Sequence, residues 1–446
     1  MQKYLFKNIQ VVNEGKISNL DVLTVNERIE KIDKSINVKG KVEEIIGDGK
    51  HLFPGVIDDQ VHFREPGLTD KGDIFSESCA AVAGGVTSFM EMPNTIPNAL
   101  SVSLLQEKYA IAEKSALANY SFYMGVSNDN WEQVLKINNL KKDVCGVKIF
   151  MGSSTGNMLV NNHSTLNRIF SESELLIATH CEDESIIKKN YSELKSRKDQ
   201  LQPSDHPLIR TAEACFESSL VAIQFAKKYN SRLHILHIST EKELQLFSNM
   251  LPLKDKKITA EVCVHHLHFT ANDYEKLGYN IKCNPAIKAP HNKKALWDAL
   301  LDDRLDVIAT DHAPHLISEK QPPYEDAHAG LPLVQHSLLL MLHYYKLGIV
   351  TLEKIAEKMS HAVADCFSIN DRGYIREGYF ADLVVADIHT SSQVQKDNIF
   401  YKCGWSPLEE FIFPGTIKNT MVNGNMVYEN GLLNAAFNGK RLSFNR

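Results

Sequence analysis

Between residues 52 and 311 the chain alternates short apolar runs with longer amphipathic stretches. The amphipathic stretches, such as 103–118, 206–229 and 293–301, place apolar residues three and four positions apart, which is typical of helices that pack one face on a core. Eight apolar runs occur before the pattern stops, and eight parallel strands is the number that closes into a barrel. We therefore predict an α/β fold built on a (β/α)8 TIM barrel. The predicted strands are 52–62, 86–92, 120–126, 145–151, 175–181, 232–239, 258–265 and 305–311.

Both ends of the chain have a β texture. Residues 1–50 hold short β-like runs separated by turn signals, and Asn423-Gly424 is a strong hairpin signal within 375–446. About fifty residues are too few for a stable sheet domain of their own. We therefore predict that residues 1–50 and residues 375–446 together form one small β-sandwich, with the barrel at 51–374 between them in the sequence.

Composition excludes several functional classes. The chain is 43% hydrophobic and 23% charged with a net charge of -6, and it has no basic patch of the kind that binds nucleic acid. No apolar run approaches the ~20 residues that span a bilayer, and residues 1–7 show no long apolar segment of the signal-peptide kind. The eight cysteines form no C-x-x-C pair, which is typical of reduced thiols. We expect a cytoplasmic protein with a small-molecule ligand, no nucleic acid and no membrane partner.

The first predicted barrel strand carries an unusual row of polar residues. The period of two places Asp58, Gln60, His62 and Arg64 on one side of the strand. Burying an acid, an amide, an imidazole and a guanidinium is costly unless each finds a partner, so the row is expected to line a site. The alternative interpretation is a polar edge strand.

Lone polar residues also fall at the ends of other predicted strands. Because the carboxyl ends of barrel strands meet at one mouth, these residues should converge although they are far apart in the sequence. Taken singly, His180 is a plausible core histidine and Asp311 a plausible helix cap. Together they indicate a site. The set comprises His62, Asn94, Lys148, His180, His237 and Asp311.

Three imidazoles and a carboxylate suit zinc, which takes nitrogen and oxygen ligands. Lys148 lies in an apolar strand, where desolvation favours the neutral, nucleophilic amine. Such an amine can take up carbon dioxide and become a carbamate, an anionic ligand able to bridge two metals. The alternative is a lysine that extends from the strand end to solvent.

Several segments in order resemble the amidohydrolase superfamily, and within it the dihydroorotases of the longer, bacterial type. The resemblance covers essentially the whole chain, and GYFADLV at 378–384 matches the return to the β-sandwich. The other matching segments are PGVID at 54–58, VHFREPG at 61–67, MPNT at 92–95, GVK at 146–148, THCE at 179–182, HIST at 237–240, KCNP at 282–285 and IATDHAPH at 308–315.

The resemblance implies a role for each matched residue. His62 would bind a first metal, His180 and His237 a second, and a carbamate on Lys148 would bridge them. Asp311 would contact metal and act as the catalytic base. The residues implied for substrate binding are Arg64, Asn94 and Asn284, which would hold a carboxylate, and His315, Ala329 and Gly330, which would contact a pyrimidine ring.

The sequence departs from the family pattern at one position. The family has a histidine two residues before His62, and this chain has Gln60, whose amide oxygen is a poorer zinc ligand. We therefore expect one tightly bound zinc and a second, weaker one.

The resemblance implies the reversible, zinc-dependent cyclisation of N-carbamoyl-L-aspartate to L-dihydroorotate in pyrimidine biosynthesis. It also suggests a homodimer and raises a pyrimidine-pathway enzyme as a partner. Two alternatives stay open. One is an allantoinase or hydantoinase type of cyclic amidohydrolase, against which Arg64 argues because those substrates offer no carboxylate. The other is a catalytically silent homologue that serves as an assembly partner, which Gln60 alone supports.

Overall fold

A computed structural model describes residues 2–152 and 157–446. Its centre is an eight-stranded parallel sheet in which every strand neighbours the next in sequence. The first and last strands approach each other through a bridge between Val61 and His312, where the His62 amide donates to the His312 carbonyl at 2.7 Å. The predicted barrel is confirmed. Its strands are β6 (Val56–Val61), β7 (Val86–Glu91), β8 (Asn119–Gly125), β9 (Gly146–Phe150), β10 (Ile177–His180), β11 (Leu233–Ile235), β12 (Ile258–Cys263) and β13 (Val307–Ala309).

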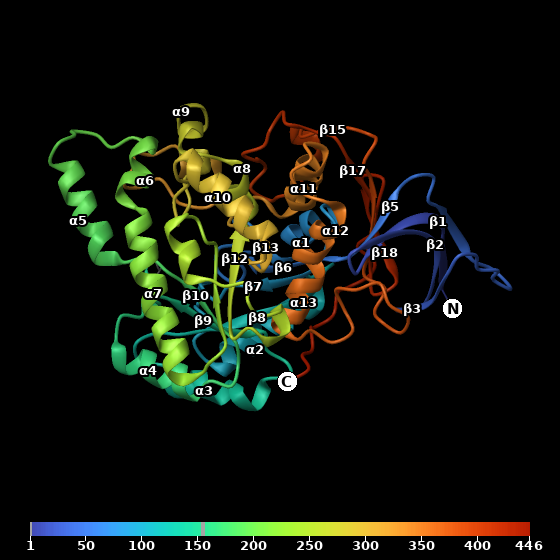
Figure 1. Cartoon of the computed structure of the whole chain (residues 1–446), viewed down its shortest axis with the longest axis horizontal. Coiled ribbons are helices and arrows are strands. Elements are labelled where there is room, and N and C mark those ends of the chain that lie inside the picture. Colours follow the sequence, from blue (N-terminus) through green and yellow to red (C-terminus); the bar gives the residue numbers. More distant parts are fainter. Residues whose placement is uncertain (1, 153–156) are drawn as a thin grey trace.

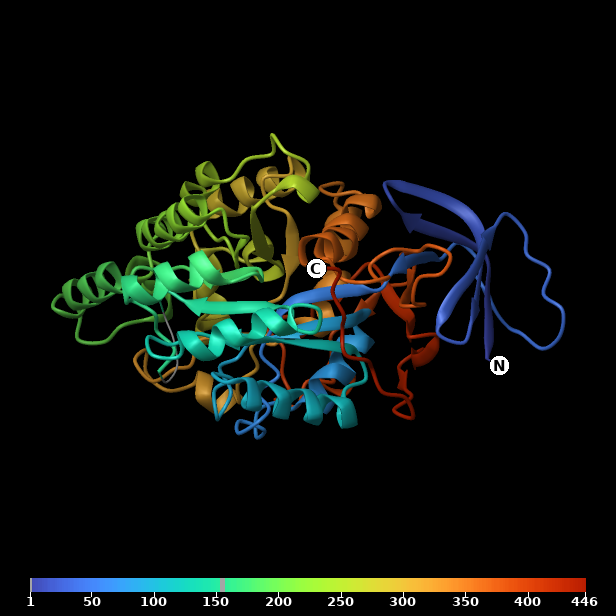
Figure 2. The same ribbon diagram turned by 90° about the horizontal axis from the view of Figure 1, so that it is seen from below.

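Helices surround this sheet, as Figures 1 and 2 show. The longest, α7, begins after Thr211, whose side chain accepts from the Ala214 amide, and ends at Asn230 in the left-handed conformation, with φ 54°. The helices are α1 (Ile74–Ala83), α2 (Val102–Ser115), α3 (Trp131–Leu135), α4 (His163–Glu172), α5 (Glu184–Lys195), α6 (His206–Ile209), α7 (Ala212–Tyr229), α8 (Val264–His268), α9 (Tyr274–Leu277), α10 (Pro290–Leu301), α11 (Ser337–Lys346), α12 (Leu352–Ala356) and α13 (Ala362–Phe367).

Several expected elements are divided in the structure, among them the helical stretch 206–229, which forms α6 and α7. The stretch 351–367, in which apolar residues again recur at the three- and four-residue spacing that predicts a helix, consists of α12 and α13 joined by a π-helical segment, Glu357–His361. The strand predicted over 52–62 belongs to two sheets, because β5 (His51–Pro54) pairs with the terminal strands and β6 starts the barrel. The break follows from Pro54, which has no amide to donate. The next residue, Gly55, lets β7 approach closely, since a Cβ at this position would lie 2.1 Å from the Thr87 hydroxyl.

Strands from both chain ends join one nine-stranded sheet, with β5 lying between β1 and β14. This confirms that the two ends assemble together, and Figure 1 shows the sheet beside the barrel. The hairpin signal at Asn423-Gly424 joins two of its strands, with both residues at positive φ. The strands are β1 (Lys3–Asn13), β2 (Lys16–Val25), β3 (Arg28–Asp33), β4 (Glu43–Ile46), β5, β14 (Leu383–Asp387), β17 (Thr416–Val422), β18 (Asn425–Glu429) and β19 (Leu432–Leu433); a separate pair is β15 (Ser392–Gln393) with β16 (Ile412–Phe413).

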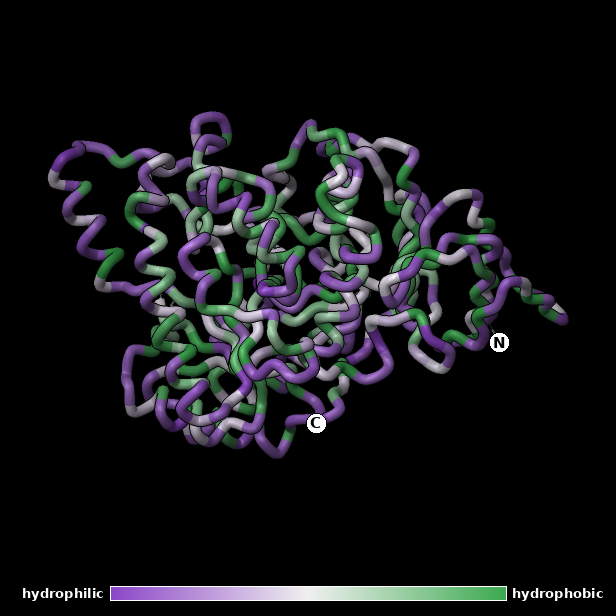
Figure 3. The backbone as a smooth tube through the Cα atoms, viewed as in Figure 1, coloured by the Kyte–Doolittle hydropathy of each residue, from purple (hydrophilic) through white to green (hydrophobic). Residues whose placement is uncertain are grey.

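The core lies between the barrel strands and the helices around them. Figure 3 shows hydrophobic segments through the middle of the molecule and hydrophilic ones along its outer edges. All eight cysteines are free thiols, seven of them buried, which confirms the absence of a disulfide framework. Among the described residues, no helix has the length and apolar character needed to cross a bilayer.

Candidate active site at the barrel mouth

A cavity of about 220 Å³ opens at the carboxyl ends of the barrel strands. Every residue predicted for the site lines it, so residues from Gln60 to Gly330 converge although they are widely spaced in sequence. Their individual roles stay predictions. Asp58 is the exception within the polar row, because its carboxylate turns away to accept from the Thr310 hydroxyl at 2.6 Å. The lining residues are Gln60, His62, Arg64, Asn94, Lys148, Phe150, His180, His237, Asn284, Asp311, Ala313, His315, His328, Ala329 and Gly330.

One half of the cavity is organised around His62. Its Nδ1 lies 2.8 Å from the Asn94 side-chain oxygen, which can only accept, so Nδ1 carries the proton. Burial lowers the pKa of His62 and favours the neutral ring, leaving Nε2 as a bare lone pair. This nitrogen lies 3.1 Å from Asp311 Oδ1, so two electron-rich atoms face each other. A cation between or beside them would satisfy both, as expected of metal ligands.

Asp311 is anionic in this setting. Burial raises the pKa of its carboxyl, but a protonated His62, through its charge and a hydrogen bond from Nε2, lowers the pKa below the usual value. With a neutral His62, a metal ion at the same place would supply the positive charge instead. The Gln60 amide group adds a second contact, since its Nε2 donates to Asp311 Oδ1 at 3.0 Å. The Gln60 nitrogen therefore faces the carboxylate, and an amide nitrogen has no lone pair to offer a metal.

The other half of the cavity is a histidine pair. His180 Nε2 lies 3.0 Å from Glu182 Oε2 and donates to it, so His180 Nδ1 is a bare lone pair that faces His237 Nε2 at 2.9 Å. Two nitrogens on a tetrahedral zinc lie about 3.3 Å apart, so the pair fits one metal. Burial raises the pKa of Glu182, but Arg210 and His180 together bring it down to about 2. The anionic Glu182 thus fixes the His180 tautomer, as carboxylates behind metal-binding histidines do.

Lys148 lies between the two halves on β9 and is fully buried. Burial lowers its pKa to about 7, which makes the neutral amine available near neutral pH. Its Nζ lies 4.5 Å from the centre of the Phe150 ring rather than in solvent. This rules out the alternative of a lysine that reaches bulk water, and it leaves an amine that can react with carbon dioxide.

Arg64 brings a positive charge to the cavity. Its Nε donates to the Pro314 carbonyl at 3.0 Å, and its terminal nitrogen lies 3.0 Å from His315 Nε2. Burial lowers the pKa of Arg64 to about 10, so it stays protonated at neutral pH. Two contacts leave other N–H groups of the guanidinium available to an anion. Gly330 closes this side of the cavity at φ 142°, with its amide donating to the Lys282 carbonyl at 2.8 Å.

Three site residues other than glycine adopt left-handed backbone conformations: Arg64 at φ 72°, His237 at φ 41° and Asp311 at φ 48°. Such conformations are uncommon for these residue types and concentrate at functional sites. They turn the chain just after β6, β11 and β13, so that the side chains face the cavity. The alternation of side chains along a strand does not predict these left-handed turns.

Sequence reasoning missed several residues that shape the site. Glu182 had a signal, since it follows His180 by two positions and therefore leaves β10 on the same side. His206 had none: it starts α6, and its Nε2 lies 3.1 Å from the Asn284 side-chain oxygen and 2.8 Å from the Cys283 carbonyl, which fixes Asn284. Phe150 and His328 also line the cavity.

Other groups in the described chain also have metal-ligand chemistry. One lies at the cavity edge, a second is buried within the barrel between β6, β11 and β12, and a third follows β12. The first comprises His315, Glu319 and His328, the second Asp59, His234 and Glu261, and the third Cys263, His265 and His266.

Comparison with known proteins defines the class. Residues 51–427 match the model of the amidohydrolase family. The chain is 31% identical over 445 residues to a dihydroorotase of Methanosarcina acetivorans, an alignment that covers 96% of this chain and 92% of the relative. The chain belongs to the amidohydrolase family, whose members are generally metal-dependent.

Two further comparisons bear on the reaction and on the fold, respectively. An allantoinase of Desulfitobacterium hafniense is 29% identical, with 98% of each chain covered. The structure of an L-hydantoinase from Arthrobacter aurescens superposes with a TM-score of 0.90 over 97% of both chains, at 24% identity, which bears on the fold alone. The protein is therefore a hydrolase that acts on cyclic amide bonds of a small-molecule substrate.

Proposed function

We propose that this protein is a dihydroorotase, which interconverts N-carbamoyl-L-aspartate and L-dihydroorotate in pyrimidine biosynthesis. The supporting observation is the combination within one cavity of two groups of metal-type ligands, a buried Lys148 between them and the Arg64 cation. A cyclic amide that carries a carboxylate needs all three features, whereas an uncharged ring needs no cation.

The metal centre would use His62 and Asp311 on one side, His180 and His237 on the other, and a carbamate on Lys148 between them. When bound, zinc supplies a Lewis acid and makes water acidic enough to yield hydroxide near neutral pH. Asp311, with its lowered pKa, is ready to accept a proton from the attacking water and to deliver it to the departing ring nitrogen. In ring closure the same carboxyl group moves the proton in reverse.

Substrate orientation would depend on Arg64, because a guanidinium grips a carboxylate through parallel, charge-assisted hydrogen bonds. Asn94 is oriented by His62 and Asn284 by His206, so both amides are fixed before substrate arrives. The wall beside Arg64, formed by His315, Ala329 and Gly330, would contact the ring. We further propose that the enzyme works in the cytoplasm and that it forms a homodimer. Size-exclusion chromatography with light scattering tests the oligomeric state.

The allantoinase relative makes allantoin hydrolysis the second candidate. The experiment gives purified, zinc-supplemented protein carbamoyl-aspartate at mildly acidic pH, dihydroorotate at alkaline pH, and allantoin or hydantoin in parallel. We expect turnover of the first two only. Turnover of allantoin in preference to dihydroorotate would replace the proposal with the second candidate, and no turnover of any substrate would favour a silent homologue.

A further inference from the structure

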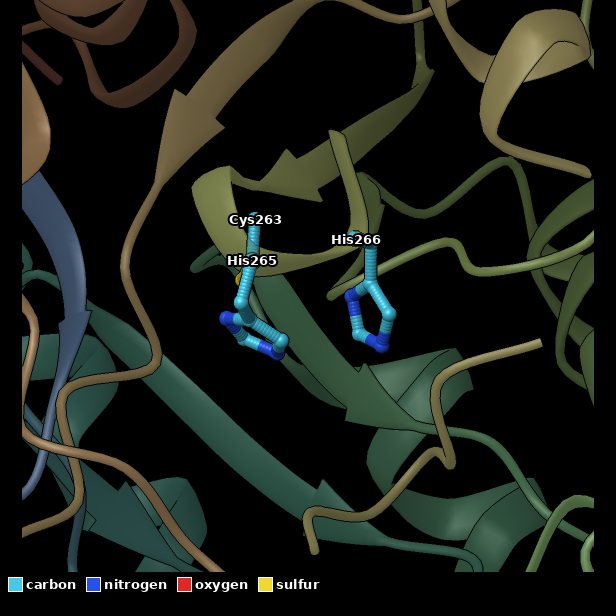
Figure 4. Close-up of side chains that lie close together, drawn as sticks. All are labelled: Cys263, His265 and His266. Atoms are coloured by element: carbon cyan, nitrogen blue, oxygen red, sulfur yellow. The ribbon is translucent and has the colours of Figure 1, made fainter. Parts of the chain in front are cut away.

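The third of these groups with metal-ligand chemistry lies beside the cavity residue Gln60, where β12 ends at Cys263 and α8 begins. Cys263, His265 and His266 are all buried, and one potential ligand atom from each lies within 4.8 Å of the other two. Figure 4 shows both imidazole rings on the same side of the turn, with Cys263 beside His265. None of the three belongs to the proposed catalytic ligands.

The hydrogen bonding of His266 leaves one nitrogen ready for a metal. Its Nε2 lies 3.1 Å from the Pro285 carbonyl, which can only accept, so Nε2 carries the proton. Its Nδ1 is then a bare lone pair, and this atom is buried without a hydrogen-bond partner among the described residues. A ring nitrogen whose opposite N–H is held by a carbonyl is the usual arrangement of a metal-binding histidine.

His265 is more exceptional, because both of its ring nitrogens are buried without a well-formed hydrogen bond in the described part of the chain. Leaving polar groups desolvated and unpaired is costly, so such a group indicates an additional ligand. Burial lowers the pKa of His265 to about 4, against smaller opposing effects of Asp311 and the Thr310 backbone, so the ring is neutral, as metal binding requires. Its ring centre lies 4.2 Å from that of His266.

Cys263 connects the cluster to the cavity. Its Sγ lies 3.3 Å from Glu261 Oε1 and 3.8 Å from Gln60 Oε1. The other end of the same Gln60 amide donates to Asp311. Gln60 therefore lies between the two sites, at the position where the related family has a histidine.

We propose that Cys263, His265 and His266 form a separate site for a divalent metal of borderline softness, zinc in the first instance. Sulfur and imidazole together are ligands that zinc prefers. Ligand atoms on a tetrahedral zinc lie about 3.3–3.7 Å apart, so small side-chain adjustments suffice to close the site. Binding converts the Cys263 thiol to a metal-bound thiolate and releases its proton to solvent. Three protein ligands leave a fourth position for water or for the Gln60 oxygen.

Cobalt substitution tests the site by a signal that the catalytic ligands do not give. Metal-free protein is titrated with Co²⁺ alone, and the near-ultraviolet charge-transfer band of a cobalt-bound thiolate is recorded. The proposed catalytic ligands contain no sulfur, so the band reports only this cluster. We expect the band in the wild type and its loss in Cys263→Ser. The matched control is Cys181→Ser, which removes a buried thiol beside His180 and should retain the band.

A second variant, His265→Asn, keeps the thiol and should need at least about tenfold more cobalt for half-saturation. Thermal melting of each metal-free variant checks that it is folded. Absence of the band in the wild type would overturn the proposal, and so would its persistence in Cys263→Ser. Either result leaves the proposed dihydroorotase activity untouched, because that activity is assayed with substrate.

Discussion

The two halves of the cavity differ in how their metal-type ligands are supported. On the β10 and β11 side, His180 and His237 face each other at 2.9 Å. The anionic Glu182 contacts His180, and the Arg210 cation pairs with Glu182. On the β6 side, His62 and Asp311 stand with Gln60, whose amide nitrogen is engaged by Asp311. One half has two imidazoles and the other has one.

This difference shows how a fold keeps a site's shape while changing its chemistry. The β6 backbone brings position 60 to the cavity whatever residue it carries, so the glutamine remains well placed. Ligand strength, however, depends on the side chain, and a glutamine whose nitrogen donates a hydrogen bond to Asp311 offers that nitrogen to no metal at the His62 half. We therefore expect tight binding at the His180 and His237 half and weak binding at the His62 half.

The largest loss of activity is expected from a substitution that weakens metal binding in both halves of the cavity. Lys148→Ala deletes the group that would bridge the two metals, and we expect activity to fall on the order of 10⁴-fold with loss of bound zinc. A short carboxylic acid added to the assay should restore part of the activity by replacing the carbamate. The control is Lys142→Ala, which alters an exposed lysine just before β9. Full activity in Lys148→Ala would show that Lys148 supplies no ligand shared by the two halves.

Glu182→Gln affects only the histidine-pair half. The folded pKa of Glu182 is about 2, against about 4.3 in an unfolded chain. A depressed carboxyl pKa contributes stability that is fully present above about pH 4.3 and is lost as pH falls through about 2. In metal-free protein at pH 7 the substitution should therefore cost on the order of 3 kcal/mol, with the difference from wild type shrinking toward pH 2. Urea unfolding across pH measures this, and a pH-independent difference would contradict the assignment.

Arg64→Met tests whether Arg64, which lies in the same half of the cavity as His62, holds the carboxylate of the substrate. Losing a charge-assisted pair to a carboxylate should lower kcat/KM for dihydroorotate about a hundredfold, with zinc content unchanged. Arg168→Met, on the exposed face of α4, is the matched control. Normal turnover of dihydroorotate by Arg64→Met would show that substrate is held elsewhere and would strengthen the allantoinase alternative.

Much of this arrangement could be predicted from the sequence, because it depends on periodicity and on strand ends. The eight barrel strands, the joining of both chain ends and the convergence of His62, Lys148 and Asp311 all follow from such patterns. The break of strand 52–62 does not show in the apolar run. Pro54 is its signal in the sequence, whereas the close approach of Thr87 to Gly55 is seen only in the fold. The same holds for the partners of Gln60, which lie about 200 residues or more away along the chain.

The cluster after β12 shows a second limit of periodicity. The apolar run predicts one strand over 258–265, but the strand ends at Cys263 and a short helix follows. That turn brings His265 and His266 onto the same side, which alternation along a strand would have prevented. The sequence alone therefore does not predict that the side chains of two adjacent histidines lie on the same side, because this depends on the local backbone conformation.

Zinc retention measures the inequality of the two halves most directly. Two variants are compared, Cys263→Ser and Cys263→Ser with Gln60→His, because the cysteine substitution removes the separate cluster from both. The zinc bound per chain is counted after dialysis against a mild chelator. We expect about one retained zinc per chain when Gln60 is kept and about two when Gln60→His is added, together with at least about tenfold tighter binding at the weaker half. Two equally retained zinc ions in the chain that keeps Gln60 would contradict the account.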